Sequence, residues 1–149
     1  MKFRLKEQFL VALVICSLVG CSSEPSRYAA TGTVSMDGKP APFVVITFHA
    51  KSGDAAASGS GRTDVKGDFK IGEDGKNSGF QTGEYKVTFT QSIVKGQPTL
   101  AGSGGKEGEK IASEKEGVAD EFRDREKTPV TANIVKGKNE FKFEIKAKK

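Results

Sequence analysis

The chain has 149 residues, of which 24 are Lys or Arg and 19 are Asp or Glu, so its net charge is +5. These charges are interspersed along the sequence instead of gathered in blocks, which favours solubility and argues against nucleic-acid binding. Gly is abundant at 18 residues, Trp is absent and only two Cys are present. Many Gly, few helix signals and short alternating apolar runs predict a single all-β domain.

The first twenty residues have the organisation of an export signal. Three basic residues lie among the first six, and an apolar run follows over residues 9–20. This run is shorter than the roughly 20 residues that cross a bilayer as a helix. It ends in Leu-Val-Gly-Cys at residues 18–21, which resembles the lipobox of bacterial lipoproteins. The resemblance implies cleavage after Gly20 and attachment of diacylglycerol to the thiol of Cys21.

A lipidated Cys21 implies a membrane-anchored protein, because two or more acyl chains hold a protein stably on a bilayer. In lipoproteins of cells with two membranes, a residue other than Asp after the Cys implies the outer membrane, and here that residue is Ser22. Cys16 would leave with the signal, so no thiol would remain for a disulfide, a zinc site or a nucleophile. The alternatives are an ordinary secretory signal with a chance Cys and a plain transmembrane anchor.

The mature chain is expected to begin with a flexible polar tether over residues 21–29, followed by a β-domain over residues 30–147. A first strand is predicted over residues 31–36, and an Asp-Gly-Lys-Pro turn follows at residues 37–40. Residues 43–49 alternate with period two, which predicts a second strand with three apolar side chains on one face.

Four further elements are predicted by the same reasoning. A strand is expected near residues 58–63, a tight turn at residues 64–68, a short strand at residues 69–71 and a longer strand at residues 84–91. In the longer strand Tyr85, Val87 and Phe89 should point inward, and Lys86, Thr88 and Thr90 outward.

The C-terminal part of the chain is expected to close the fold. Strands at residues 131–135 and 140–145 are predicted to form a hairpin across the turn at residues 136–139. Before them, residues 95–120 are rich in Gly, Lys and Glu and offer little apolar surface for burial, which predicts a long flexible loop.

About seven strands at short spacing favour a β-sandwich, in which two sheets bury their apolar faces against each other. The predicted core residues are Val34, Ile46, Phe48, Phe69, Tyr85, Val87, Phe89, Phe141, Phe143 and Ile145.

Several short motifs occur in an order that is similar to that of carboxypeptidase regulatory-like domains. They are Gly-Thr-Val at residues 32–34, Asp-Gly-Lys-Pro at 37–40, Val-Val-Ile-Thr-Phe at 44–48, Thr-Asp with Gly-Asp-Phe within 63–69, and Gly-Glu-Tyr-Lys-Val at 83–87. The last motif departs from the pattern in having Thr82 where Pro is commoner. The resemblance implies a seven-stranded transthyretin-like or immunoglobulin-like β-sandwich after a cleaved lipoprotein signal peptide. It implies no shared catalytic residues.

Candidate chemical groups are few. His49 is the only histidine, so a Ser/His/Asp triad would need it as base, but its place at a strand end favours a structural role. Asp64 and Asp68, with Glu73 and Asp74 nearby, offer carboxylates for Ca²⁺. Their spacing is not that of an EF-hand, and Asp64 is better explained as a turn residue that accepts backbone N–H bonds. No catalytic residue, metal site or cofactor is predicted.

Two functions follow from these observations. The first is a lipid-anchored, non-catalytic interaction or accessory module of the cell envelope, bound to the membrane through Cys21 and contacting an envelope protein, with no nucleic-acid partner. The alternative is a small-ligand binding module for a glycan or Ca²⁺. The contact surface is expected at the loop over residues 95–120 or at a sheet edge.

Overall fold

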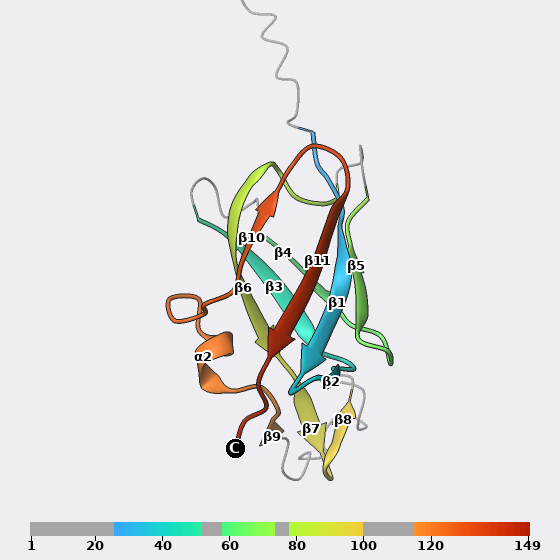
Figure 1. The fold of residues 1–149 in the computed structure, drawn as a ribbon, viewed down its shortest axis with the longest axis vertical. Helices are drawn as coiled ribbons and strands as arrows, with labels where there is room; N and C mark the ends of the chain where they lie inside the picture. Colours follow the sequence, from blue (N-terminus) through green and yellow to red (C-terminus); the bar gives the residue numbers. More distant parts are fainter. Residues whose placement is uncertain (1–25, 52–57, 74–77, 100–114) are drawn as a thin grey trace, which may run out of the picture.

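The computed structural model describes residues 26–51, 58–73, 78–99 and 115–149. These residues form eleven short strands and one helical turn, so the protein is all-β, as the sequence predicts (Figure 1). The strands form two four-stranded sheets and one three-stranded sheet. The count exceeds the predicted seven partly because β2 and β9 have only two residues each, too few to show an alternating pattern.

The first sheet is built around β1 (Ala30–Met36). On one side β1 pairs in parallel with β11 (Asn139–Ile145) over seven residue pairs. On its other side β1 pairs antiparallel with β5 (Asp68–Ile71) and with β2 (Lys39–Pro40). Strands near the beginning and the end of the chain therefore lie side by side in the middle of the molecule (Figure 1).

The second sheet is antiparallel throughout. Its order is β10 (Thr131–Ile134), β6 (Gly83–Thr90), β3 (Val45–Ala50) and β4 (Gly59–Arg62). Its apolar face meets that of the first sheet, because buried side chains of both sheets belong to one core cluster.

The third sheet lies at the opposite end of the molecule from the first described residues (Figure 1). Its strand order is β8 (Gln97–Thr99), β7 (Ser92–Val94) and β9 (Lys115–Glu116). Lys95 and Gly96 join β7 to β8, and both have positive φ, 50° and 78°. Two-residue turns with positive φ match the twist of paired strands, which explains the tight hairpin.

Residues 95–120, predicted to be one long flexible loop, contain β8 and β9 at their two ends, and residues 100–114 lie outside the described residues. The second end is fixed by one carboxylate. Glu116 Oε1 accepts hydrogen bonds from the backbone N–H of Gln91 at 2.8 Å and of Val118 at 3.0 Å. Such non-local hydrogen bonds do not show in local composition, so the sequence did not predict this order.

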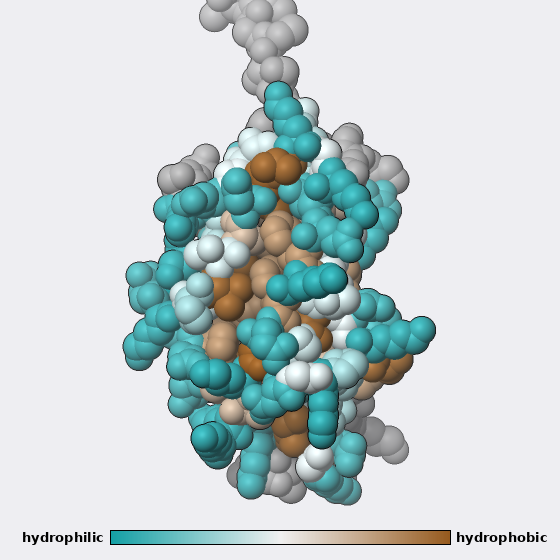
Figure 2. All heavy atoms as spheres, viewed as in Figure 1, coloured by the Kyte–Doolittle hydropathy of each residue, from teal (hydrophilic) through white to brown (hydrophobic). Residues whose placement is uncertain are grey.

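Phe48 lies at the centre of the core. Its ring centroid is 4.7 Å from that of Phe80, 6.2 Å from that of Tyr85 and 6.2 Å from that of Phe143, which belongs to the other sheet. Nine of the ten predicted core residues are buried and the tenth, Phe141, is partly buried against them, so the core prediction is confirmed. On the face seen in Figure 2, less polar residues run down the middle between hydrophilic side chains.

The predicted C-terminal hairpin is wrong. β10 pairs with β6 in the second sheet, whereas β11 pairs with β1 in the first, so residues 135–138 form an arch between the sheets. Ala132 and Ile134 of one strand and Phe143 and Ile145 of the other lie in the same core. Strands placed in opposite sheets bury these apolar faces against each other, which a two-stranded hairpin alone cannot do.

The outer face of β6 is covered by a helical turn, α2 (Asp120–Arg123), that the sequence does not predict. Thr88, predicted to point outward, lies on that outer face but is only 7% exposed. Its hydroxyl oxygen lies 2.9 Å from Nε2 of His49. Thr128, which follows α2, is also buried, and its hydroxyl donates to the carbonyl of Val87 at 2.7 Å.

The core arrangement predicts a large loss of stability for Phe48→Ala. The substitution removes a fully buried ring and leaves a cavity between the two sheets, so the free energy of unfolding should fall by about 3–5 kcal/mol. Urea denaturation followed by circular dichroism measures this loss. Val65→Ala is the control, because Val65 is 68% exposed. A loss below about 1 kcal/mol for Phe48→Ala would contradict the central position of this ring.

Candidate functional site

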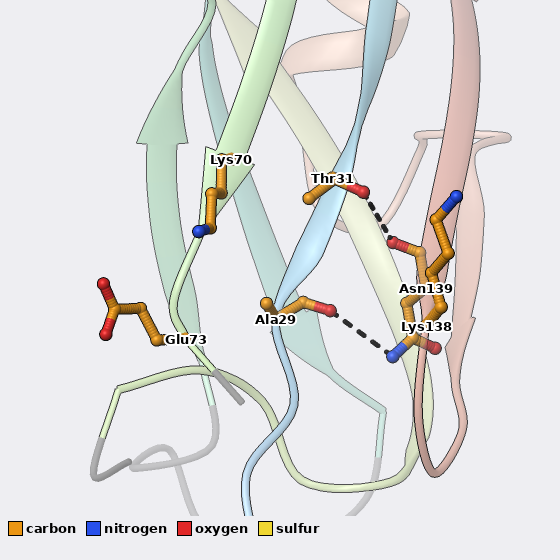
Figure 3. Close-up of a pocket in the computed structure, with 6 residues that line it drawn as sticks. All are labelled: Ala29, Thr31, Lys70, Glu73, Lys138 and Asn139. Atoms are coloured by element: carbon orange, nitrogen blue, oxygen red, sulfur yellow. Dashed lines mark hydrogen bonds between the residues drawn. The ribbon is translucent and has the colours of Figure 1, made fainter. Parts of the chain in front are cut away.

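A polar hollow of about 390 Å³ lies where the chain enters β1 (Figure 3). Strands β1 and β5 and the start of β11 contribute its walls, so the first described residues meet the arch before β11 here. The lining residues are Ala29, Thr31, Lys70, Glu73, Lys138 and Asn139.

Asn139 forms the buried part of this hollow, and all of its side-chain polar atoms are engaged. Oδ1 accepts the backbone N–H of Val135 at 2.8 Å, while Nδ2 donates to the carbonyls of Val135 at 3.0 Å, Gly137 at 2.9 Å and Ala29 at 3.4 Å. One amide thus holds the arch in shape and fastens it to the entrance of β1. Its role is structural, because a ligand would have to replace these bonds.

The charged groups of the hollow are largely solvent-exposed. Lys138 Nζ lies 2.7 Å from Glu140 Oε2, and these side chains are 80% and 55% exposed. The hydrogen bond between them raises the pKa of Lys138 and lowers the pKa of Glu140. Exposed pairs of this kind contribute little to stability. The hollow is therefore a surface depression lined by the exposed residues Lys70, Glu73 and Lys138.

A second hollow, of about 550 Å³, lies where the C-terminal residues meet the segment before α2. Its lining residues are Asp37, Ala119, Asp120, Glu121, Lys146, Ala147, Lys148 and Lys149. The backbone N–H of Ala119 donates to Lys146 O at 3.0 Å, and that of Lys148 donates to Gly117 O at 2.8 Å. Lys148 Nζ also lies 2.9 Å from Asp120 Oδ1, and this hydrogen bond is the main cause of the lowered pKa of Asp120. The contacts fasten the C-terminal segment to residues 117–120.

His49 lies on the outer face of the second sheet. The hydroxyl of Thr88 is the hydrogen-bond partner of the His49 ring at 2.9 Å, and the positive charge of Arg125 repels a protonated imidazole. Burial is the main cause of its lowered pKa, and the positive charge of Arg125 adds to the effect. The guanidinium of Arg125 donates to the carbonyl of Ala50 at 2.9 Å, which holds it there. The arrangement stabilises a neutral imidazole among hydroxyl and guanidinium groups, with no carboxylate among these partners.

Asp64 acts as the turn residue that the sequence predicts. Its Oδ1 accepts the backbone N–H of Lys66 at 2.7 Å and of Asp68 at 2.9 Å. Within the described ranges no group of three or more His, Cys, Asp or Glu side chains is placed to hold a metal ion. Of the carboxylates considered for Ca²⁺, Asp74 lies outside those ranges, as does Cys21, the predicted lipidation residue.

The edge of β11 that faces away from β1 is open. Phe143 O and Ile145 O accept hydrogen bonds from Ser35 Oγ at 3.3 Å and Asp37 N at 3.1 Å, so these carbonyls point toward β1. Successive residues of a strand direct their backbone groups to opposite sides, so the even-numbered residues of β11 point away from β1. Among the described strands β11 pairs only with β1. An unpaired strand edge of this kind can accept another strand.

The exposed face of β11 carries charges of strictly alternating sign. Lysine and glutamate alternate at every second position from residue 138 to residue 146, in the order Lys138, Glu140, Lys142, Glu144 and Lys146. All five are exposed. The alternation is visible in the sequence, but the open edge beside it depends on the pairing of β1 with β11.

No family model, curated protein or solved structure matches the chain. The candidate sites are therefore defined by the geometry of this chain alone.

The hydrogen bonds of Asn139 predict a specific loss of stability. Asn139→Ala removes all four and takes away the buried amide that links Val135, Gly137 and Ala29, so the free energy of unfolding should fall by about 2–3 kcal/mol. Asn133→Ala, at an exposed position of β10, is the matched control. Urea denaturation of both variants makes the comparison, and equal effects would show that the amide does not hold the arch.

The environment of His49 predicts a low titration midpoint. As the only histidine, it gives a single set of ring signals in NMR, and their midpoint should lie below the ordinary value of 6.5. Arg125→Ala should raise the midpoint only in part, because burial is the larger cause. Since the folded state disfavours the proton, stability should be full above pH 6.5 and decline as the pH falls below it. A midpoint at or above 6.5 would contradict the described environment.

Proposed function

We propose that the protein is a lipid-anchored, non-catalytic interaction module of the cell envelope, attached to the outer membrane through Cys21. The observation that carries the proposal is the order of features in the first 21 residues: basic residues, a short apolar run and the Leu-Val-Gly-Cys motif. No helix among the described residues is long and apolar enough to cross a membrane. Acylation of Cys21 would supply the attachment.

The domain is proposed to be a transthyretin-like β-sandwich of the carboxypeptidase regulatory-like type. Two four-stranded sheets whose aromatic side chains meet in one core support this assignment. The positions of two motifs also support it. The Asp37–Pro40 segment contains the tight turn between β1 and β2, and the Asp64–Asp68 segment contains the tight turn that leads into β5. In such a scaffold the binding function belongs to edges and loops.

The described sites favour an interaction surface over a small-ligand site. The buried amide of Asn139 and the carboxylate of Asp64 are both engaged by the protein's own backbone. The two hollows are open depressions whose Lys138 and Lys148 already contact carboxylates. The open edge of β11, by contrast, offers backbone groups that β1 does not use.

Intact-protein mass spectrometry of the membrane fraction tests the proposed anchor. Wild-type protein should begin at Cys21 and carry the added mass of acyl chains, and Cys21→Ser should lose that mass and leave the membrane fraction. Cys16→Ser is the control, because residue 16 lies in the segment expected to be removed, so the mature species should be unchanged. A wild-type species without acyl mass in the soluble fraction would refute the anchor.

A further inference from the structure

We propose that the protein self-associates through β11, which pairs antiparallel with β11 of a second copy so that the two-fold axis passes beside Phe141. The inference rests on the proposed interaction function and names the partner as a second copy of this chain. Four observations support it: an open backbone edge, a cover at one end of that edge, a self-complementary row of charges and a partly buried aromatic ring.

The available edge is limited to the first part of β11. Beyond the strand, the backbone of Lys146 and Lys148 on this same edge is already bonded to Ala119 and Gly117. A second strand can therefore reach the outward backbone groups of Glu140, Lys142 and Glu144, but not those that follow. Antiparallel pairing would satisfy the N–H and C=O groups of these residues.

The charges select one register. If Lys142 faced Lys142 of the second copy, Glu140 would face Glu144, and every pair would join like charges. A shift of two residues makes Glu140 face Lys142 of the second copy and Lys138 face Glu144, so every pair from Lys138 to Glu144 joins opposite charges. In the monomer the Glu144 carboxylate accepts hydrogen bonds from Ser35 Oγ and from the backbone N–H of Gly38, so the Glu140–Lys142 pairs at the centre carry most of the selection. Opposite charges directly across two strands are stabilising and like charges are destabilising.

A second complementary register exists, but the structure blocks it. In that register Glu140 would face Lys146 of the second copy, whose outward backbone is covered by residues 117–119. The cover thus leaves the register centred on Phe141. The alternating charges disfavour the register in which Lys142 faces Lys142, and residues 117–119 block the register in which Glu140 faces Lys146.

The selected register also places two aromatic rings together. Phe141 is the one predicted core residue that is only partly buried, and its ring stacks on that of Phe143 at 5.6 Å with an interplanar angle of 7°. Its backbone faces β1, so Phe141 and Phe141 of the second copy would form a non-hydrogen-bonded pair, in which side chains approach most closely. Pairing would cover the part of each ring that the core leaves exposed.

The arrangement is compatible with attachment of both copies to one membrane. Ala30, at the start of β1, pairs with Asn139, which is only two residues from the axis at Phe141. The N-terminal segments of both copies therefore enter the dimer near its two-fold axis, although the two domains run in opposite directions.

Charge exchange tests the proposal. The full chain, purified in detergent, is examined by sedimentation velocity over a range of concentrations. Wild type should form dimers, and Lys142→Glu or Glu140→Lys alone should weaken the dimer at least about tenfold, because two attractive cross-strand pairs become repulsive. The double variant E140K/K142E should recover wild-type dimerisation. A mixture of the two single variants should form mixed dimers, because each supplies the charges that the other lacks.

Lys142→Pro and Lys70→Glu complete the design. Lys142→Pro removes an N–H that points away from β1, so it should abolish dimers while the thermal unfolding of the monomer stays close to that of wild type. Lys70→Glu makes the same charge change on β5, across β1 from the open edge, and should leave the dimer intact.

A wild-type chain that stays monomeric at the highest concentration would overturn self-association, as would dimers that resist both Lys142 variants. If the acylated chain instead stays monomeric and binds a different envelope protein, self-association is overturned while the proposed function stays in place.

Discussion

The parallel pairing of β1 with β11 is the constraint on which the rest of the structure depends. It joins strands more than a hundred residues apart over seven residue pairs, with β1 inside the first sheet and β11 at its edge. The pairing is so close that a Cβ on Gly32 would lie 1.9 Å from Phe141 O, so only glycine fits at this position. The motif glycine of the first strand therefore has a structural reason in this chain.

Much of the remaining architecture follows from that pairing. Because β11 belongs to the first sheet and β10 to the second, residues 135–138 must cross between sheets, and Asn139 shapes that crossing. The crossing brings the rings of Phe141 and Phe143 from one sheet against Phe48 from the other. It also leaves the far edge of β11 open, apart from the end that residues 117–119 cover. A single pairing thus defines the core, the arch and the candidate interaction surface.

Sequence reasoning identified individual strands well and their partners poorly. Alternation along a strand is a local property, which is why it predicts that Tyr85, Val87 and Phe89 point inward, as they do in the structure. Pairing is not local, so the short polar turn at residues 136–139 predicts a hairpin although β10 and β11 lie in different sheets. Phe80 and Phe122 are buried but stand alone among polar neighbours, so no period marked them. The charge row of β11 was visible in the sequence, but the open edge beside it was not.

Amide hydrogen exchange in β11, measured by NMR at low and high protein concentration, tests the central claim that this strand is bonded on one side and open on the other. The amides of Phe141 and Phe143 should be protected at both concentrations, because they face β1. Those of Glu140 and Lys142 should exchange rapidly in dilute solution and become protected as the concentration rises. Protection of all four amides in dilute solution, or rapid exchange of Glu140 and Lys142 at every concentration, would contradict this account.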